Sequence, residues 1–137
     1  MKRLTHQNGK YLLDTNVLIA LLEDEIVIQV QDRSQNATIV SLPAPAIGEL
    51  YYGARKSGNL IENLARVNRL TQRFPLLFCD LETAQWYGII KNQLRRKGRP
   101  IPNNDIWIAA IAMQHGLILV TRDSHFEEIE SLQTERW

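Results

Sequence analysis

Short apolar runs recur along the chain, and stretches with helical spacing separate them. Four of these runs are almost free of charged residues, which is typical of strands buried on both faces of a sheet. They are Tyr11–Leu13, Thr38–Leu42, Leu76–Cys79 and Leu117–Thr121. The last segment, Leu132–Trp137, alternates in polarity and is predicted to be an edge strand.

Three of the intervening segments carry apolar residues at the spacing of one helix face. These faces consist of Leu60, Leu64, Val67 and Phe74; of Ala84, Tyr87 and Leu94; and of Ile106, Ala109, Ala110 and Met113. The segment Glu25–Gln31 fits both a strand and a helix, and we predict a helix. Strands that alternate with helices predict an α/β fold with a parallel sheet, whose functional residues lie at the carboxyl ends of the strands.

The composition fits one ordinary folded domain and excludes a disordered or fibrous chain. The chain has 137 residues, of which 45% are hydrophobic and 23% charged. We expect a single domain over residues 1–137, with residues 1–10 as a flexible N-terminal lead. No export signal is recognisable, and the uncharged stretch Ile106–Thr121 is too short and too polar to span a bilayer. The single cysteine, Cys79, lies in a predicted buried strand, so we expect no disulfide and a cytoplasmic location.

Two acidic residues directly follow predicted strands. Asp14 ends the first apolar run, in Leu12-Leu13-Asp14-Thr15-Asn16, and Asp123 follows the run that ends at Thr121. Because the carboxyl ends of parallel strands lie at one edge of the sheet, both side chains are expected to face the same cleft. Each residue alone also fits the N-cap of the helix that follows it.

Two further acidic residues lie near predicted helix starts. Glu49 follows Pro45 and has apolar neighbours, so we expect it early in a helix and facing inward, where an unpaired carboxylate is costly. Asp105 follows Asn103 and Asn104, so we expect an asparagine N-cap with the acid in the first helical turn. Ordinary capping explains each position alone, but four caps at equivalent strand ends and helix starts form the less economical explanation.

Several carboxylates in one cleft repel each other unless a hard divalent cation lies among them. Oxygen ligands favour Mg²⁺, or alternatively Mn²⁺, over zinc. Zinc is further disfavoured because His6, His115 and His125 show no ligand spacing with Cys79 or with one another. His115 precedes Gly116 and is predicted to end a helix. The formal net charge is only +1, but with the four acids gathered in one site the remaining surface would be basic.

Four motifs together resemble those of PIN domains, and most closely those of VapC-type toxins. They are Leu12-Leu13-Asp14-Thr15-Asn16, Glu49-Leu50-Tyr51-Tyr52-Gly53, Pro102-Asn103-Asn104-Asp105 and Val120-Thr121-Arg122-Asp123. The resemblance covers the chain from Tyr11 to Trp137. It implies a three-layer α/β/α sandwich with a mostly parallel five-stranded sheet.

The resemblance also implies a function. Members are Mg²⁺-dependent ribonucleases, the toxins of toxin–antitoxin pairs, whose partner is a small antitoxin, and they commonly form homodimers. Asp14, Glu49 and Asp105 match the core catalytic and metal-binding acids, and Asp123 matches a fourth, more variable acid. Asn16 and Thr121 match positions that support these acids.

Basic and aromatic residues flank the motifs. Arg95, Arg96, Lys97 and Arg99 precede Asp105, and Arg55 and Lys56 follow Glu49. They are candidates to bind RNA phosphates, although basic residues also favour helix ends without any ligand. Tyr51, Tyr52 and Trp107 fit stacking on unpaired bases, and for Trp107 we favour core packing.

Two other interpretations stay open at this point. An aspartate-based phosphatase or receiver domain uses a similar sheet, but a phosphatase of the haloacid-dehalogenase type needs a second acid where Asn16 stands. A non-catalytic RNA- or protein-binding module would use the acids only as helix caps. Asp14→Asn separates a ligand from a cap, because asparagine keeps an oxygen acceptor but loses the charge.

Overall fold

The computed structural model describes residues 9–24, 30–31, 35 and 39–137. Its centre is one five-stranded sheet in the order β3-β2-β1-β4-β5, in which every pair of neighbouring strands is parallel. The strands are β1 Lys10–Leu13, β2 Ile39–Pro43, β3 Leu76–Leu77, β4 Ile118–Val120 and β5 Thr134–Glu135. This confirms the predicted parallel sheet and the edge position of the last strand.

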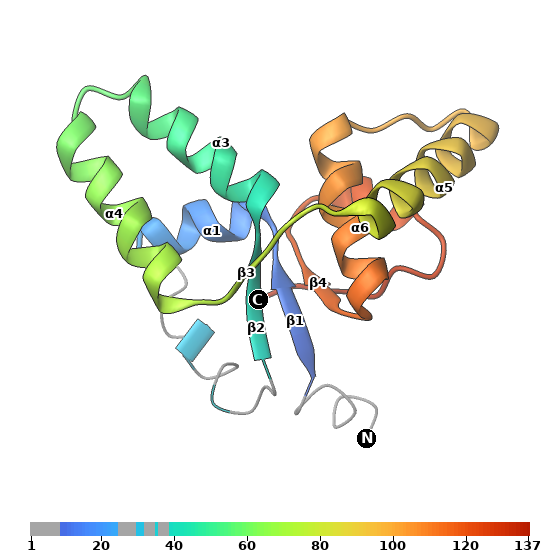
Figure 1. Cartoon of the computed structure of the whole chain (residues 1–137), viewed down its shortest axis with the longest axis horizontal. Coiled ribbons are helices and arrows are strands. Elements are labelled where there is room, and N and C mark those ends of the chain that lie inside the picture. The colour runs from blue at the N-terminus through green and yellow to red at the C-terminus, as the bar shows by residue number, and fades with distance from the viewer. Residues whose placement is uncertain (1–8, 25–29, 32–34, 36–38) are drawn as a thin grey trace.

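Helices cover the sheet in two groups, which makes a three-layer α/β/α sandwich (Figure 1). One group contains α1 Thr15–Leu22, α3 Ala44–Arg55 and α4 Leu60–Arg73. The other contains α5 Leu81–Lys97 and α6 Asn103–His115, and a 3₁₀ helix, η2 Ser124–Glu128, follows β4. The strand order reverses between β1 and β4, so the carboxyl ends of these two strands form the place where such folds bind ligands.

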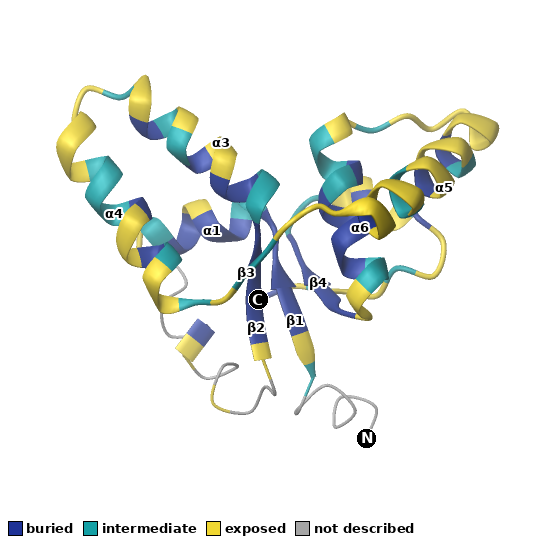
Figure 2. Ribbon diagram, in the orientation of Figure 1, coloured by how far each residue is buried: buried dark blue, intermediate teal, exposed yellow. Residues whose placement is uncertain are grey.

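The core lies along the central strands and α6 (Figure 2). Leu12, Leu13, Leu119 and Val120 are completely buried, because β1 and β4 are covered on both faces. The helix α6 is buried around most of its circumference, so Ile106–Ala112 contributes more to the core than its one predicted face. His115 ends α6 as predicted, since Gly116 follows it at φ +64°.

The segment Leu76–Cys79 does not form the buried strand that its apolar residues predict. The strand β3 covers only Leu76 and Leu77, both half-buried, and Cys79 is exposed. The physical reason is its position: β3 is an edge strand with one neighbour, and Phe78 beyond it is also exposed. The argument from a buried cysteine is therefore wrong.

Two predicted helix faces are displaced at their starts. In α5 the polar Thr83 is buried and Ala84 is exposed, because Asp80 and Thr83 form a capping box that turns Thr83 inward. In α4 the buried residues are Val67 and Leu70, whereas Leu60 at the helix start is exposed.

Two predictions fall largely on residues that the structure does not describe. Most of the predicted lead 1–10 and most of the predicted helix Glu25–Gln31 lie outside the described residues. Within the described part of the chain, no helix combines the length and apolar character needed to cross a membrane.

Candidate active site

Asp14 lies at the carboxyl end of β1 and is only 3% exposed. Its backbone N–H donates to the carbonyl of Val120 in β4 at 2.9 Å, and its own carbonyl accepts from Val17 and Leu18 in the first turn of α1. Asp14 thus occupies the N-cap position, as the capping interpretation expects, but its side chain makes no capping hydrogen bond. The carboxylate is therefore not used by the helix.

The Thr121 hydroxyl orients the Asp14 carboxylate. Oδ2 accepts from the Thr121 hydroxyl at 2.8 Å, and Oδ1 is buried with no hydrogen-bond partner among the described residues. Burial raises the pKa of Asp14 from 3.8 to about 6. The Thr121 hydroxyl and the backbone N–H of Thr15 oppose this rise, and the charges of Asp105 and Asp123 add to it. A buried carboxylate oxygen that accepts no hydrogen bond is energetically costly, and a bound cation would offset this cost.

Asp105 lies in the first turn of α6, as predicted. The N-cap is Pro102 and not an asparagine, because the proline takes an extended conformation and both asparagines enter the helix. Burial raises the pKa of Asp105, and the carboxylates of Asp123 and Glu49 contribute in the same direction, whereas contact with His125 lowers it. Asp105 is therefore part of the same electrostatic cluster as Asp14.

Glu49 is exposed and does not face inward as predicted. It lies in the second turn of α3, whose first turn has no acidic residue, so the helix dipole does not explain its position. Its Oε1 accepts from the Thr15 hydroxyl at 3.0 Å and from Nδ2 of Asn104. These contacts hold Glu49 between the starts of α1 and α6.

Asp123 both caps a helix and joins the acidic cluster. Its Oδ1 accepts from the backbone N–H of His125 at 2.9 Å, which is the predicted cap of the short helix η2. Its Oδ2 lies 3.2 Å from Nδ1 of His125, and the same Nδ1 lies 3.5 Å from Oδ2 of Asp105. Ligand atoms of Asp105, Asp123 and His125 lie within 4.8 Å of one another, the spacing of a shared metal ion.

His125 is the residue that sequence reasoning missed. The three histidines lack metal-ligand spacing among themselves, but the partners of His125 are carboxylates and not other histidines. The available signal was its place two residues after Asp123, where one tight 3₁₀ turn brings the imidazole back to the strand end.

The two predicted supporting residues have different positions. Thr121 donates to Asp14 and accepts from the backbone N–H of Asp123 at 3.0 Å, so it contacts two of the acids. Among the described residues, Asn16 forms no hydrogen bond with Asp14 or Asp123. Its Oδ1 accepts from the backbone N–H of Arg122 at 3.3 Å and holds the loop that carries Asp123.

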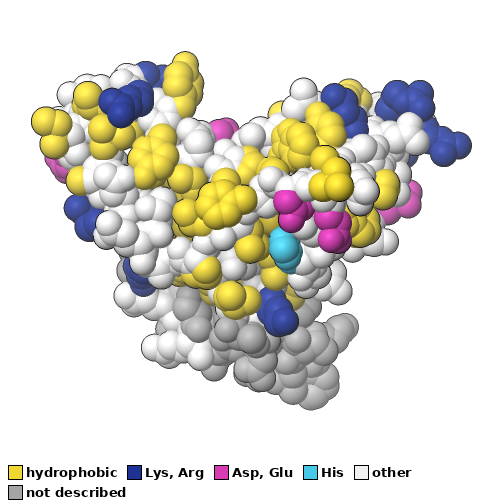
Figure 3. All heavy atoms as spheres, in the orientation of Figure 1, with side chains coloured by type: hydrophobic (Ala, Val, Ile, Leu, Met, Phe, Trp, Pro, Cys, Tyr) yellow, Lys and Arg dark blue, Asp and Glu magenta, His cyan; other side chains and the backbone are white. Residues whose placement is uncertain are grey.

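The predicted basic cluster lies at the far end of α5, beyond the sheet (Figure 1). Lys97 contacts Glu128, with Nζ 3.8 Å from its carboxylate, and Arg95 donates to Asn92 at 2.7 Å. Figure 3 shows the surface hollowed between the two helical groups, with Lys and Arg side chains mainly on the outer parts of both. Nothing in these contacts links Arg95 or Lys97 to the four acids.

The aromatic candidates differ from one another. Trp107 is half-buried and stacks on Tyr87 of α5, with ring centroids 4.1 Å apart, so it lies between α6 and α5 and not in the buried core that we predicted for it. Tyr52 is exposed, and Lys56 lies 4.8 Å from its ring centroid. Tyr51 donates to Asn68 of α4, which holds α3 on α4.

The donor set fits a hard divalent cation. Three carboxylates are electrostatically coupled, one of them buried with a partnerless oxygen, and one imidazole nitrogen lies beside the other two. Oxygen donors suit Mg²⁺, and a set with one nitrogen also suits Mn²⁺.

Comparison with known proteins assigns the family. The PIN domain family model matches residues 11–132. The chain belongs to the PIN-domain family. This membership confirms the resemblance and the sandwich fold, and it favours a nuclease site over the phosphatase alternative.

Named relatives place this PIN domain among the VapC proteins. It is 36% identical over 129 residues to "Ribonuclease VapC2" of Haemophilus influenzae, covering 93% of this chain and 98% of the relative. It is 33% identical over 129 residues to "tRNA(fMet)-specific endonuclease VapC" of Shigella flexneri, with the same coverage.

Solved structures share the fold. The VapBC complex from Salmonella typhimurium bound to DNA matches with a TM-score of 0.86 at 32% identity, covering 94% of this chain and 98% of that one. VapBC-1 from nontypeable Haemophilus influenzae matches with a TM-score of 0.84 at 32% identity, covering 93% and 98%. This PIN domain therefore resembles VapC chains along almost their whole length.

Proposed function

We propose that this protein is a divalent-metal-dependent endoribonuclease and the toxin of a toxin–antitoxin pair. The observation that carries the proposal is the buried Asp14, whose partnerless Oδ1 lies in one electrostatic cluster with Asp105 and Asp123 at the carboxyl ends of β1 and β4. The names of the VapC relatives support the ribonuclease activity. The presence of all four acids of the motifs argues against a non-catalytic binding module.

The four acids have distinct tasks in this proposal. Asp14, Asp105 and Asp123 hold Mg²⁺, or alternatively Mn²⁺, and Glu49 completes the ligand set from the opposite helix. A bound divalent cation supplies Lewis-acid stabilisation of the scissile phosphate and a water of lowered pKa. Thr121 keeps Asp14 oriented, and Thr15 and Asn104 keep Glu49 oriented, so little reorganisation is needed when RNA binds.

The attacking group is a water and not a protein side chain. Within the described residues, His125 contacts only carboxylates through Nδ1, and Cys79 is exposed with a pKa raised by partial burial and by Asp80. Neither is an activated nucleophile. Hydrolysis by water then leaves a 5′-phosphate and a 3′-hydroxyl.

The first RNA to test is initiator tRNA, because relatives from Shigella flexneri and Salmonella typhimurium are named tRNA(fMet)-specific endonucleases at 33% identity. Purified protein is incubated with this tRNA and with total RNA, with Mg²⁺ or with chelator. We expect Mg²⁺-dependent products with 5′-phosphate ends. Products with cyclic phosphate ends would contradict the mechanism, because they require attack by the 2′-hydroxyl of the RNA.

A small antitoxin is the proposed protein partner. The structures that match this chain at 32% identity are VapBC assemblies from Salmonella typhimurium and Haemophilus influenzae, in which the toxin is bound to its partner. Co-expression with a candidate antitoxin should yield one complex without ribonuclease activity. Full activity of that complex would contradict the antitoxin role.

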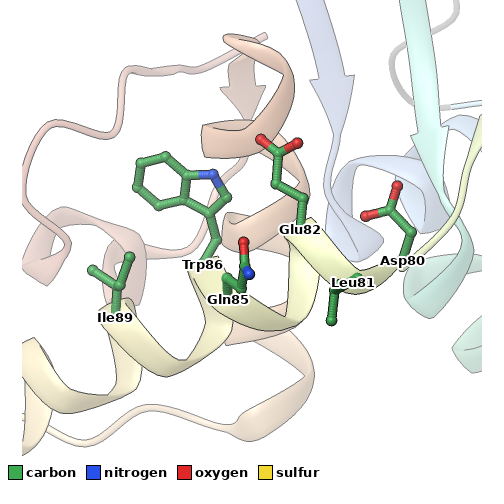
Figure 4. Close-up of a pocket in the computed structure, with 6 residues that line it drawn as sticks. All are labelled: Asp80, Leu81, Glu82, Gln85, Trp86 and Ile89. Atoms are coloured by element: carbon green, nitrogen blue, oxygen red, sulfur yellow. The ribbon is translucent and has the colours of Figure 1, made fainter.

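We also propose a homodimer, because apolar side chains on both helical groups are exposed. Ile61 in α4 is 83% exposed, whereas Leu64 and Tyr87 are half-buried. Figure 4 shows Trp86 and Ile89 projecting from the same side of α5 into a surface pocket that contains none of the four acids. Light scattering tests this, and a monomer throughout the micromolar range would contradict it.

A further inference from the structure

Three arginines form a row along one face of α4. Arg66, Arg69 and Arg73 are spaced three and four residues apart, so they lie on one side of the helix over about 10 Å. Together they line a groove whose floor is Leu70 of α4 and the leucines at the end of α1, Leu21 and Leu22. Figure 3 shows basic side chains at the outer edge of the helical group that contains α4.

The charge of the arginine row is not paired within the described part of the chain. Among the described residues, none of the three guanidinium groups forms an ion pair, although Asp24 lines the same groove. The one recorded contact is that of Arg73, whose guanidinium lies 5.2 Å from the Phe74 ring centroid. By contrast, Lys97 in the predicted basic cluster contacts Glu128. The row is therefore available for an external anion.

The groove of the arginine row continues to the acids. Arg66 and Leu22 also line a second pocket between α1, α3 and α4, and that pocket reaches Glu49. Its remaining lining is largely apolar, with Ile19 of α1 and Val67 of α4 on opposite sides. The shared residues Leu22 and Arg66 thus connect the pocket that reaches Glu49 with the groove of the arginine row.

We propose that Arg66, Arg69 and Arg73 bind the phosphates of the RNA strand that leaves the catalytic acids between α1 and α4. The inference rests on the proposed ribonuclease function and specifies how its substrate is held. Guanidinium groups bind phosphates through paired hydrogen bonds, and the apolar stretch between Arg66 and Glu49 accepts the face of a base or ribose.

An RNA strand fits this surface better than an acidic protein segment. Glu23 and Glu49 line the pocket that leads to the acids, so a carboxylate-rich partner would meet like charges there. A phosphate at that end meets the acids together with their divalent cation, which removes the repulsion. The two ends of the surface therefore suit one polymer whose phosphates reach both.

The test compares two triple variants that remove the same charge from two places, one in α4 and one at the end of α5 with the loop that follows it. One is Arg66→Gln, Arg69→Gln and Arg73→Gln, and the matched control is Arg95→Gln, Arg96→Gln and Arg99→Gln. Both are made in full-length Asp105→Asn protein, and binding of a fluorescent single-stranded RNA is measured with Mg²⁺ over a series of salt concentrations. We expect the α4 variant to bind at least about tenfold more weakly at low salt, with the slope of log K against log salt reduced by about 2. The control removes the other candidate phosphate contacts and should lose less affinity and less slope than the α4 variant.

Cleavage separates this inference from the proposed function. With Asp105 intact, the α4 variant should cleave a short oligonucleotide that spans only the acids as fast as the wild type, and lose efficiency on long RNA. Unchanged RNA affinity and salt slope in the α4 variant, while the wild type cleaves RNA, would overturn the arginine row alone. Equal losses of RNA affinity in both triple variants would overturn the proposal as well, because binding would then depend on the total charge and not on where the arginines lie. Absence of cleavage by every protein would overturn the proposed function, and the binding comparison would still decide the row.

Folding of the α4 variant is controlled independently. Arg69 and Arg73 are exposed, so the single variants Arg69→Gln and Arg73→Gln should keep the wild-type melting temperature. Each should reduce the salt slope by about 0.7. Two single variants with the parent slope would contradict the proposal even if the triple variant failed to fold. Reduced affinity for an acidic protein partner with unchanged RNA binding would assign the row to that partner instead.

Discussion

The Thr121 hydroxyl donates a 2.8 Å hydrogen bond to Oδ2 of Asp14, which joins the ends of the two central strands, β4 and β1. The hydrogen bond occupies one oxygen of a buried carboxylate and leaves Oδ1 without a partner in the described residues. One contact thereby fixes the orientation of Asp14 and keeps its second oxygen available to a cation.

Thr121→Val should destabilise the metal-free protein and weaken metal binding. Valine keeps the shape of threonine but removes the hydroxyl donor, which deprives Asp14 of its Thr121 hydrogen bond and raises its pKa further. We expect a loss of about 1–3 kcal/mol in the free energy of unfolding at neutral pH, measured by urea unfolding in chelator. Thr121→Ser retains the hydroxyl and should behave as the wild type. Wild-type stability in the valine variant would show that the hydrogen bond does not hold Asp14.

Asp14→Asn should make the metal-free protein more stable than the wild type at neutral pH. Between pH 3.8 and about 6, folded Asp14 keeps a proton that the unfolded chain has released. The unfolded state therefore binds fewer protons, and the contribution of Asp14 to stability falls as pH rises through this range. The stability difference between variant and wild type should grow by up to about 3 kcal/mol from pH 4 to pH 7.5.

The measurement is urea unfolding of both proteins in chelator at the two pH values. Addition of Mn²⁺ or Mg²⁺ at pH 7.5 should stabilise the wild type and reverse the order, because a cation binds the charged carboxylate and not the amide. A difference that does not change with pH would contradict a raised pKa for Asp14.

Thr83→Val should weaken the fold without affecting the site. Thr83 is completely buried; its hydroxyl accepts from the backbone N–H of Asp80 at 2.9 Å and is hydrogen-bonded to Gln114 of α6. Loss of this capping box should cost about 1–2 kcal/mol of unfolding free energy, measured by urea unfolding. RNA cleavage per folded molecule should remain at the wild-type rate. A selective loss of cleavage would mean that the start of α5 takes part in catalysis.

The sequence predicts the positions of those acids that directly follow the strands of the sheet. Asp14 and Asp123 directly follow β1 and β4, and parallel neighbouring strands must bring their carboxyl ends together. Asp105 lies in the first turn of its helix as predicted, although α6 begins after Pro102 and not after the predicted asparagine cap. These positions depend on features encoded within a few residues.

Other positions depend on contacts that no local pattern contains. The direction in which Glu49 points is set by Thr15 and Asn104, which lie 34 and 55 residues away in the chain. The position of His125 depends on one 3₁₀ turn that returns it to Asp105. The exposure of Cys79 follows from β3 being an edge strand, which apolar composition alone does not reveal.

Cleavage of RNA by Asp105→Asn and Asp80→Asn proteins tests the central claim most directly. Both variants lose one carboxylate, but Asp105 lies in the acidic cluster, whereas Asp80 caps α5 through an oxygen that asparagine retains. With Mg²⁺ we expect wild-type cleavage by Asp80→Asn, a loss of at least about 100-fold for Asp105→Asn, and no cleavage by any protein in chelator. Cleavage by Asp105→Asn at the wild-type rate, or wild-type cleavage that persists in chelator, would contradict a metal-dependent ribonuclease site at these acids.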